Sequence, residues 1–197
     1  MSHHIYHTEG FVLRGESVGE ANKYFSIFTK DFGMIGATAQ GVRLLKSKLR
    51  YSLQDYSYSK ISLVKGKHIW RIVGATKEND WHRSLNGSRG KFELLAKTFL
   101  LLLRLVRGEE KNEILFGHIS SACEFLEKEN FDGSLLRNCE HLLIMRILHS
   151  LGYMAESPDF KEFLSSAVWT KELVSKVSPL GRDAVSQINK ALKETQL

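Results

Sequence analysis

The chain has 197 residues, of which 43% are hydrophobic and 25% charged, an ordinary composition for a globular protein. Its formal net charge is +6 at pH 7. The longest apolar run, residues 99–103, ends at Arg104 and is far too short to span a bilayer, and residues 1–7 lack the pattern of a secretory signal. These features favour a cytoplasmic protein without a membrane span.

Five short strands are predicted in the first part of the chain. Alternating aromatic and β-branched residues indicate the strands, and turns such as Asp31-Phe32-Gly33 separate them. The predicted strands are residues 8–14, 23–29, 34–40, 56–64 and 68–74. Five strands of this length favour a small Greek-key barrel of the OB type, although an SH3-like barrel fits the count nearly as well.

The connection after the third strand carries the strongest functional signal. Arg43, Lys46, Lys48 and Arg50 follow Gly41, and residues 32–54 contain no acidic residue that could neutralise them. Unneutralised cations of this kind suit a polyanion, whose phosphates they contact without reading bases. The alternative is a solvated surface cluster without a ligand.

Other residues of the predicted barrel are candidates to extend this polyanion-binding surface. The additional cations are Arg14, Lys23, Lys65, Lys67 and Arg71. Exposed rings would stack on bases, and the candidate rings are Tyr24, Tyr51, Tyr56, Tyr58 and Trp70. We interpret most of the rings as barrel core and expect Tyr51, beside Arg50, to be the exposed one. Small residues at 36, 37 and 39 are expected to let another backbone approach closely.

From about residue 81 the apolar spacing becomes helical. Helices are predicted at residues 90–107, 112–129, 134–151 and 180–192, with a shorter segment after Pro158. The helix at 134–151 is the most apolar and is expected to be the centre of a bundle. The predicted class is therefore α+β, with an N-terminal five-stranded OB-fold barrel followed by an all-helical C-terminal domain.

The charge is distributed unevenly between these two parts. Residues 1–80 carry 12 Lys and Arg against 7 Asp and Glu, whereas residues 81–197 carry 16 against 15. A basic module joined to a nearly neutral one is typical of nucleic-acid-binding proteins. We expect an OB-fold domain at residues 1–80 and a helical domain at residues 81–197, with the boundary in the polar stretch near residues 77–88.

Neither a metal site nor a catalytic site is predicted. Cys123 and Cys139 lie in apolar helical surroundings and are interpreted as reduced, buried thiols. Cys123 is about 140° around a helix from His118, so that the two do not share a face, and no CxxC or HxxxH spacing occurs. The sequence also lacks a nucleophile elbow, a phosphate-binding glycine loop and an HExxH motif. We therefore expect no cofactor and no enzymatic activity.

Several linked segments resemble the N-terminal domain of the bacterial RecO family of recombination-repair proteins. The segments are TEGFVL at 8–13, GEANK at 19–23, FTKDFGMI at 28–35, AQGVR at 39–43, KSKL at 46–49 and Leu53-Gln54. Their order and spacing match the family. Looser similarity at residues 110–116 (EKNEILF) and 147–153 (ILHSLGY) extends the resemblance over nearly the whole chain.

This resemblance implies a non-enzymatic, nucleoid-associated role in DNA repair. The family binds single- and double-stranded DNA, anneals complementary strands, and works with RecR and the single-strand-binding protein SSB to load RecA. The acidic, apolar-ended C-terminal tail of SSB is expected to bind the helical domain. Many members carry a four-cysteine zinc module after an LGY segment, but residues 153–163 contain no cysteine, so no zinc module is expected.

The leading hypothesis is thus a DNA-binding recombination mediator that anneals strands and helps load recombinase onto SSB-coated single-stranded DNA. One alternative is an RNA-binding OB module, which the relative affinities for RNA and DNA of the same sequence would distinguish. The other is a protein adaptor with a structural barrel, which would neither anneal strands nor retain DNA at low salt.

Overall fold

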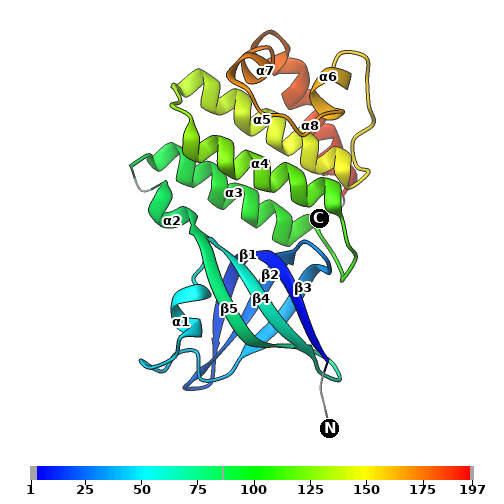
Figure 1. Cartoon of the computed structure of the whole chain (residues 1–197). Coiled ribbons are helices and arrows are strands. Elements are labelled where there is room, and N and C mark those ends of the chain that lie inside the picture. The colour runs from blue at the N-terminus through cyan, green and yellow to red at the C-terminus, as the bar shows by residue number, and fades with distance from the viewer. Residues whose placement is uncertain (1–3, 86, 196–197) are drawn as a thin grey trace. The chain divides into compact units, whose positions relative to one another are not determined.

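A computed structural model of the chain describes residues 4–85 and 87–195 (Figure 1). The chain divides into two compact units. The barrel unit comprises residues 1–87 and 99–112, and the helical unit comprises residues 88–98 and 113–197. Residues 99–112, which the sequence pattern places with the helices, group with the barrel in this division. The domain boundary between residues 80 and 81 stays a prediction.

Five strands form a closed barrel in the order β1-β2-β3-β5-β4. The strands are β1 (Ile5–Val18), β2 (Asn22–Thr29), β3 (Gly33–Ala39), β4 (Ser57–Lys65) and β5 (Trp70–Asp80). All neighbours pair antiparallel except β3 and β5, whose short parallel contact places Ala37 opposite Trp70. The predicted α+β fold, an N-terminal OB-fold barrel followed by helices, is confirmed.

Two strands extend well beyond their predicted ends. β1 has an irregularity between Val12 and Arg14 that lets its first part pair with β4 and its second part with β2. β5 continues to Asp80, and the short helix α2 (Trp81–Ser84) follows directly. The Asp80 carboxylate caps α2 by accepting a hydrogen bond from the Arg83 amide. The polar stretch near residues 77–88 therefore begins as the end of a strand and a short helix.

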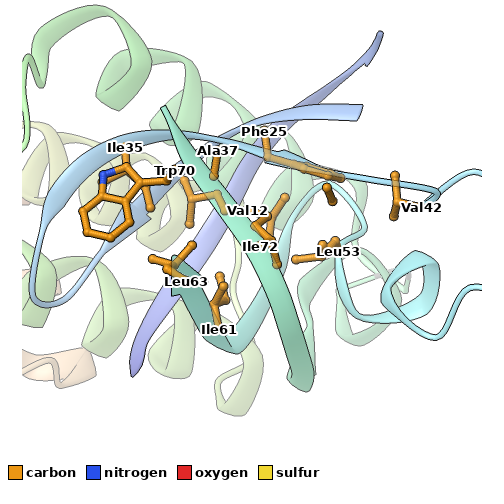
Figure 2. Close-up of a cluster of buried hydrophobic side chains, with 12 residues drawn as sticks. Val12, Phe25, Ile35, Ala37, Val42, Leu53, Ile61, Leu63, Trp70 and Ile72 are labelled. Carbon is orange, nitrogen blue, oxygen red and sulfur yellow. The ribbon is translucent and has the colours of Figure 1, made fainter. Parts of the chain in front are cut away.

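The barrel core runs along the inside of the strands (Figure 2). It includes inward-facing residues of all five strands, together with Val42 and Leu53 from the connection between β3 and β4. Trp70 and Ile35 lie at one end of the cluster and Val42 and Leu53 at the other (Figure 2). Burying each large apolar side chain contributes about 1.5–3 kcal/mol, so this core accounts for much of the barrel's stability.

Residues 99–112 pack against the barrel through specific contacts. The Phe99 ring lies 5.9 Å from the Phe11 ring and 5.7 Å from the Tyr56 ring. The Met34 amide donates to the Gly108 carbonyl at 3.2 Å. The Trp70 indole donates to Glu109 at 2.9 Å. These contacts explain why this segment groups with the strands although much of it is helical.

The helical unit is organised around α5 (Gly133–Ser150), which packs against α4 (Glu113–Lys128), α6 (Lys161–Leu164), α7 (Lys171–Ser175) and α8 (Gly181–Glu194). The N-terminal half of α3 (Arg89–Leu105) also belongs to it, and the 3₁₀ helix η1 (Ser178–Leu180) precedes α8. The predicted central helix of a bundle is α5. None of the helices within the described ranges is long and apolar enough to cross a membrane.

Candidate nucleic-acid interface

The basic loop, which we define as residues 41–48, is fastened at its base to the turn between β1 and β2. The Gly41 amide donates to the Asn22 side chain at 2.9 Å, and the Arg43 amide donates to the Ala21 carbonyl at 3.0 Å. The Arg43 guanidinium donates to the Gly19 carbonyl at 2.8 Å. Gly41 has φ +63°, which glycine adopts without strain. The loop therefore starts from a fixed position on the barrel.

The far end of the predicted loop is a short helix, α1 (Leu49–Ser52). The Ser52 carbonyl accepts a hydrogen bond from the Ser59 hydroxyl at 2.6 Å and another from the Ser57 hydroxyl at 3.3 Å. Both of these serines are buried on β4. Arg50 and Tyr51, which the sequence pattern places in an open loop, thus lie on a helix that is held against the barrel.

Three of the predicted cations surround one cavity of about 530 Å³, which we call the basic cavity. Lys23 comes from β2, Arg43 from the basic loop and Arg50 from α1. The other lining residues are Val42, Leu53, Gln54, Asp55, Asp80 and His82. Val42 and Leu53 are core residues, so the cavity lies at their end of the barrel core (Figure 2).

The two carboxylates of the basic cavity have cationic neighbours. Burial raises the pKa of Asp55, and the charges of Lys23 and Arg14 partly oppose that rise. Burial acts on Asp80 in the same direction, but hydrogen bonds from Lys77 and from the Arg83 amide hold the pKa of Asp80 below its ordinary value. The Lys77 ammonium lies 2.8 Å from the Asp80 carboxylate and neutralises its charge. The Asp80 carboxylate therefore does not neutralise the arginines of the cavity.

The cations of the basic loop and α1 are exposed and have no acidic partner among the described residues. Within residues 4–85 and 87–195, none of Arg43, Lys46, Lys48 and Arg50 forms an ion pair. Lys48 lines a second cavity, of about 770 Å³, whose two other lysines, Lys30 and Lys60, pair with Glu9 and Glu78. A surface with several cations that lack internal counterions is suited to phosphate groups.

The remaining predicted cations are not gathered around the basic cavity. Arg14 pairs with Glu16 at 3.1 Å. Lys65 pairs with Glu109 at 3.1 Å and lies 5.0 Å from the Trp70 ring, at the end of the core opposite the basic cavity (Figure 2). Lys67 is exposed in the turn between β4 and β5, and Arg71 is half-buried on β5. Their role in DNA binding stays a prediction.

Among the candidate rings, Tyr51 is the exposed one. Its side chain is 63% exposed, whereas Trp70 is buried and the other three tyrosines are half-buried. The Lys77 ammonium lies 3.8 Å from the centre of the Tyr51 ring and occupies one of its faces. A base could therefore stack only on the other face of this ring.

Gly36, one of the small residues of β3, has a different role from the one expected of it. A side chain at Gly36 would overlap the Tyr24 ring, so Tyr24 itself fills the space above this glycine. Gly36 is therefore explained by its contact with Tyr24 and does not indicate that the backbone of a ligand approaches here.

Five polar residues in and beside the basic cavity are not apparent as site residues from the sequence: Gln54, Asp55, Lys77, Asp80 and His82. Lys77 joins two of them, because its ammonium donates to Gln54 at 2.9 Å and to Asp80 at 2.8 Å. The spacing of Lys77 and Asp80 is visible in the sequence, but the polar character of that stretch favours a domain boundary. Only the barrel closure brings it beside Arg43 and Arg50.

Known proteins resemble this chain in sequence. Residues 1–77 match the family described as "Recombination protein O N terminal". The chain belongs to the RecO family. It is 31% identical over 156 residues to the DNA repair protein RecO of Dehalococcoides mccartyi. The matched region covers 78% of this chain and 58% of that protein.

Other RecO proteins are similar in sequence to this chain to a comparable extent. The chain is 30% identical over 138 residues to RecO of Alkaliphilus metalliredigens, with 70% of this chain and 56% of that protein covered. The identity is 35% over 149 residues to RecO of Desulfitobacterium hafniense, with 76% of this chain and 52% of that protein covered. The chain thus spans little more than half the length of these curated relatives.

Two of the RecO-like segments contact each other in the structure. The segment at residues 19–23 supplies the acceptors, and the segment at residues 39–43 supplies the donors, for the hydrogen bonds at the base of the basic loop. These segments are therefore one structural unit that holds Arg43 at the basic cavity.

The residues present do not fit a four-cysteine zinc module. Cys123 and Cys139 are buried on helices and form no disulfide, and burial raises the pKa of both thiols. No cluster of three or more His, Cys, Asp or Glu in the described part of the chain is placed to hold a metal ion. We assign no metal to this chain.

Proposed function

We propose that this chain is a DNA-binding recombination mediator in DNA repair. In this role it binds single- and double-stranded DNA, anneals complementary strands and helps load a recombinase onto SSB-coated single-stranded DNA. Its membership of the RecO family supports this role, and the DNA repair proteins to which it is similar carry that name.

The observation that carries the proposal is a group of cations on an OB-fold barrel that form no ion pair with any residue the structure describes. Lys23, Arg43 and Arg50 surround one cavity, and Lys46 and Lys48 continue from it along the basic loop. Lysines and arginines that contact phosphates displace counterions from DNA, and this displacement supplies most sequence-independent affinity.

Annealing requires that both strands are brought together without their bases being held tightly. Exposed cations neutralise the phosphates of two strands and leave the Watson–Crick edges free to pair. The basic loop and α1 offer such cations next to one another, with Tyr51 as a single stacking surface. This chemistry needs no nucleotide hydrolysis, so we propose a non-enzymatic role.

The proposed protein partners are RecR and the C-terminal tail of SSB, which the RecO resemblance implies. The proposed location is the nucleoid, in the cytoplasm.

The proposal is tested by removing the charge of the basic loop and α1. In one variant Arg43, Lys46, Lys48 and Arg50 are replaced by Gln. A matched control replaces four exposed lysines of the helical unit that form ion pairs: Lys97, Lys128, Lys171 and Lys176. DNA affinity is measured by fluorescence anisotropy over a range of salt concentrations, and annealing is measured with bare and SSB-coated strands.

The loop variant should lose affinity and annealing, and its slope of log K against log salt should flatten by about 0.7 for each lost single-strand phosphate contact. The control variant should keep the wild-type slope. An unchanged slope in the loop variant would overturn the assignment of these residues. Tighter binding of RNA than of DNA of the same sequence would favour an RNA-binding module instead, and wild-type protein that retains no DNA would favour an adaptor.

A further inference from the structure

The tip of the basic loop presents an apolar side chain to solvent. Leu45 is 91% exposed, and its neighbour Leu44 is 49% exposed. Among residues 4–85 and 87–195, no other large apolar side chain is as exposed as Leu45; the next is Ile114 at 68%. Single exposed leucines are common on protein surfaces, so exposure alone does not indicate a site.

The backbone holds Leu45 in this position. The loop consists of consecutive turns in which the Leu44 amide donates to the Gly41 carbonyl at 3.1 Å and the Ser47 amide donates to the Leu44 carbonyl at 2.9 Å. Leu45 and Lys46 are the two central residues of the second turn. Because the base of the loop is fastened to the turn between β1 and β2, the leucine projects from a defined support.

The residues around Leu45 indicate what it would contact. Arg43 and Lys46 lie on either side of it in the chain, both are exposed, and neither has an acidic partner within the described ranges. A hydrophobic protein surface or a membrane core would not match the positive charges of Arg43 and Lys46. DNA matches it, because phosphates alternate with the apolar faces of bases along the strand.

We propose that Leu45 is a wedge that inserts between neighbouring bases of single-stranded DNA while the flanking cations hold the phosphates. Leucine is one of the apolar side chains that proteins insert between base steps to unstack them. The inference rests on the proposed DNA-binding function and adds a second contact, to nucleobases. Unstacking would also help annealing, because a strand freed from its own stacking exposes bases for pairing.

The wedge is tested with a single-stranded oligonucleotide that carries 2-aminopurine between adenines. Stacking quenches 2-aminopurine, so insertion of Leu45 should raise its fluorescence at saturating protein. Leu45→Ala should remove most of this rise and weaken binding by about five-fold, through lost apolar burial. Its salt slope should stay that of the wild type, because no charge is lost. Leu45→Met should restore the rise, because methionine is another apolar side chain that proteins insert between base steps and it carries no ring that could stack on the probe.

Leu100→Ala is the matched control, since Leu100 is an exposed leucine on α3, 61% exposed and outside the basic loop. It should behave like the wild type in both measurements. A rise in Leu45→Ala as large as in the wild type, or an equal loss in Leu100→Ala, would overturn the wedge while leaving DNA binding in place. Failure of the proposed function is seen separately, as the absence of wild-type binding by anisotropy.

Discussion

Two buried basic side chains, His118 and Arg146, stabilise the helical unit in different ways. Arg146 on α5 donates to the Phe163 carbonyl at 2.8 Å and to the Val168 carbonyl at 3.1 Å, and its guanidinium lies 4.7 Å from the Trp169 ring. Burial lowers the pKa of Arg146 to about 10, so it remains charged at neutral pH. Arg146 therefore fastens the segment around residues 163–169 to α5.

His118 on α4 stays neutral instead. Burial, together with the charges of Arg146 and His149, lowers the pKa of His118 to about 4. The unfolded chain would bind a proton near pH 6.5, whereas the folded chain would not until about pH 4. Between these two pH values the unfolded state holds more protons, so stability decreases as the pH falls through this window.

We predict that the free energy of unfolding falls by about 2 kcal/mol when the pH is lowered from 7 to 5, because His118 binds a proton in the unfolded state only. His118→Leu removes the titrating group and should lose correspondingly less stability over the same range. Urea unfolding of both proteins at the two pH values measures the difference. Equal losses in the wild type and in His118→Leu would show that His118 is not the group responsible.

At the scale of elements, the hairpin between β2 and β3 depends on a glycine in close contact with another segment. Gly33 has φ +63°, and a side chain there would overlap the Glu110 carbonyl. Gly19, in the turn between β1 and β2, has φ +62°, but a methyl group at this position would have no heavy atom within 4 Å. The two glycines share a left-handed backbone and differ in their surroundings.

We predict that Gly33→Ala is more destabilising than Gly19→Ala by about 2 kcal/mol or more. Both variants incur the left-handed strain of roughly 1–2 kcal/mol. Only Gly33→Ala must also displace the backbone at residue 110 and disturb the hydrogen bond from the Met34 amide to the Gly108 carbonyl. Chemical denaturation of the two variants measures this difference. Equal costs would mean that residues 108–110 yield easily to a methyl group.

Apolar periodicity predicts most of the secondary-structure elements. It does not predict elements that form only through contacts with residues far away in the sequence. The centres of all five strands and the helices α3, α4 and α5 follow from apolar periodicity. The end of β5 does not, because Lys77, Glu78 and Asp80 are typical of a polar connection and become strand only through pairing with β4. The sequence does not predict the short helix α1, because α1 is held in place by hydrogen bonds from two buried serines of β4.

The candidate site shows the same limit. The absence of acidic residues between Asp31 and Asp55 predicts the basic loop directly. The grouping of Lys23 with Arg43 and Arg50, and the separation of Lys65 from them, depend on barrel closure and on Glu109, which lies far away in the sequence. Periodicity carries no information about such contacts.

At the scale of the whole molecule, one helix contributes to both units. The N-terminal half of α3, up to Thr98, belongs to the helical unit, and the half from Phe99 belongs to the barrel unit. Leu95 and Phe99 are both 1% exposed and are only one helical turn apart. We therefore propose that the energetic division of the chain passes through α3, between these two residues.

Truncating each of these side chains tests the division. Phe99→Ala should cost about 3–5 kcal/mol and Leu95→Ala about 2–5 kcal/mol, since both leave cavities in packed cores. Hydrogen exchange should distinguish them, because local opening follows the cooperative unit that is weakened. Phe99→Ala should speed exchange mainly in β1 and at the start of β4, near its ring partners Phe11 and Tyr56, whereas Leu95→Ala should speed exchange mainly in α4 and α5. If Phe99→Ala instead accelerates exchange in α4 and α5 and leaves β1 protected, the boundary lies near residue 80 and all of α3 belongs energetically to the helical domain.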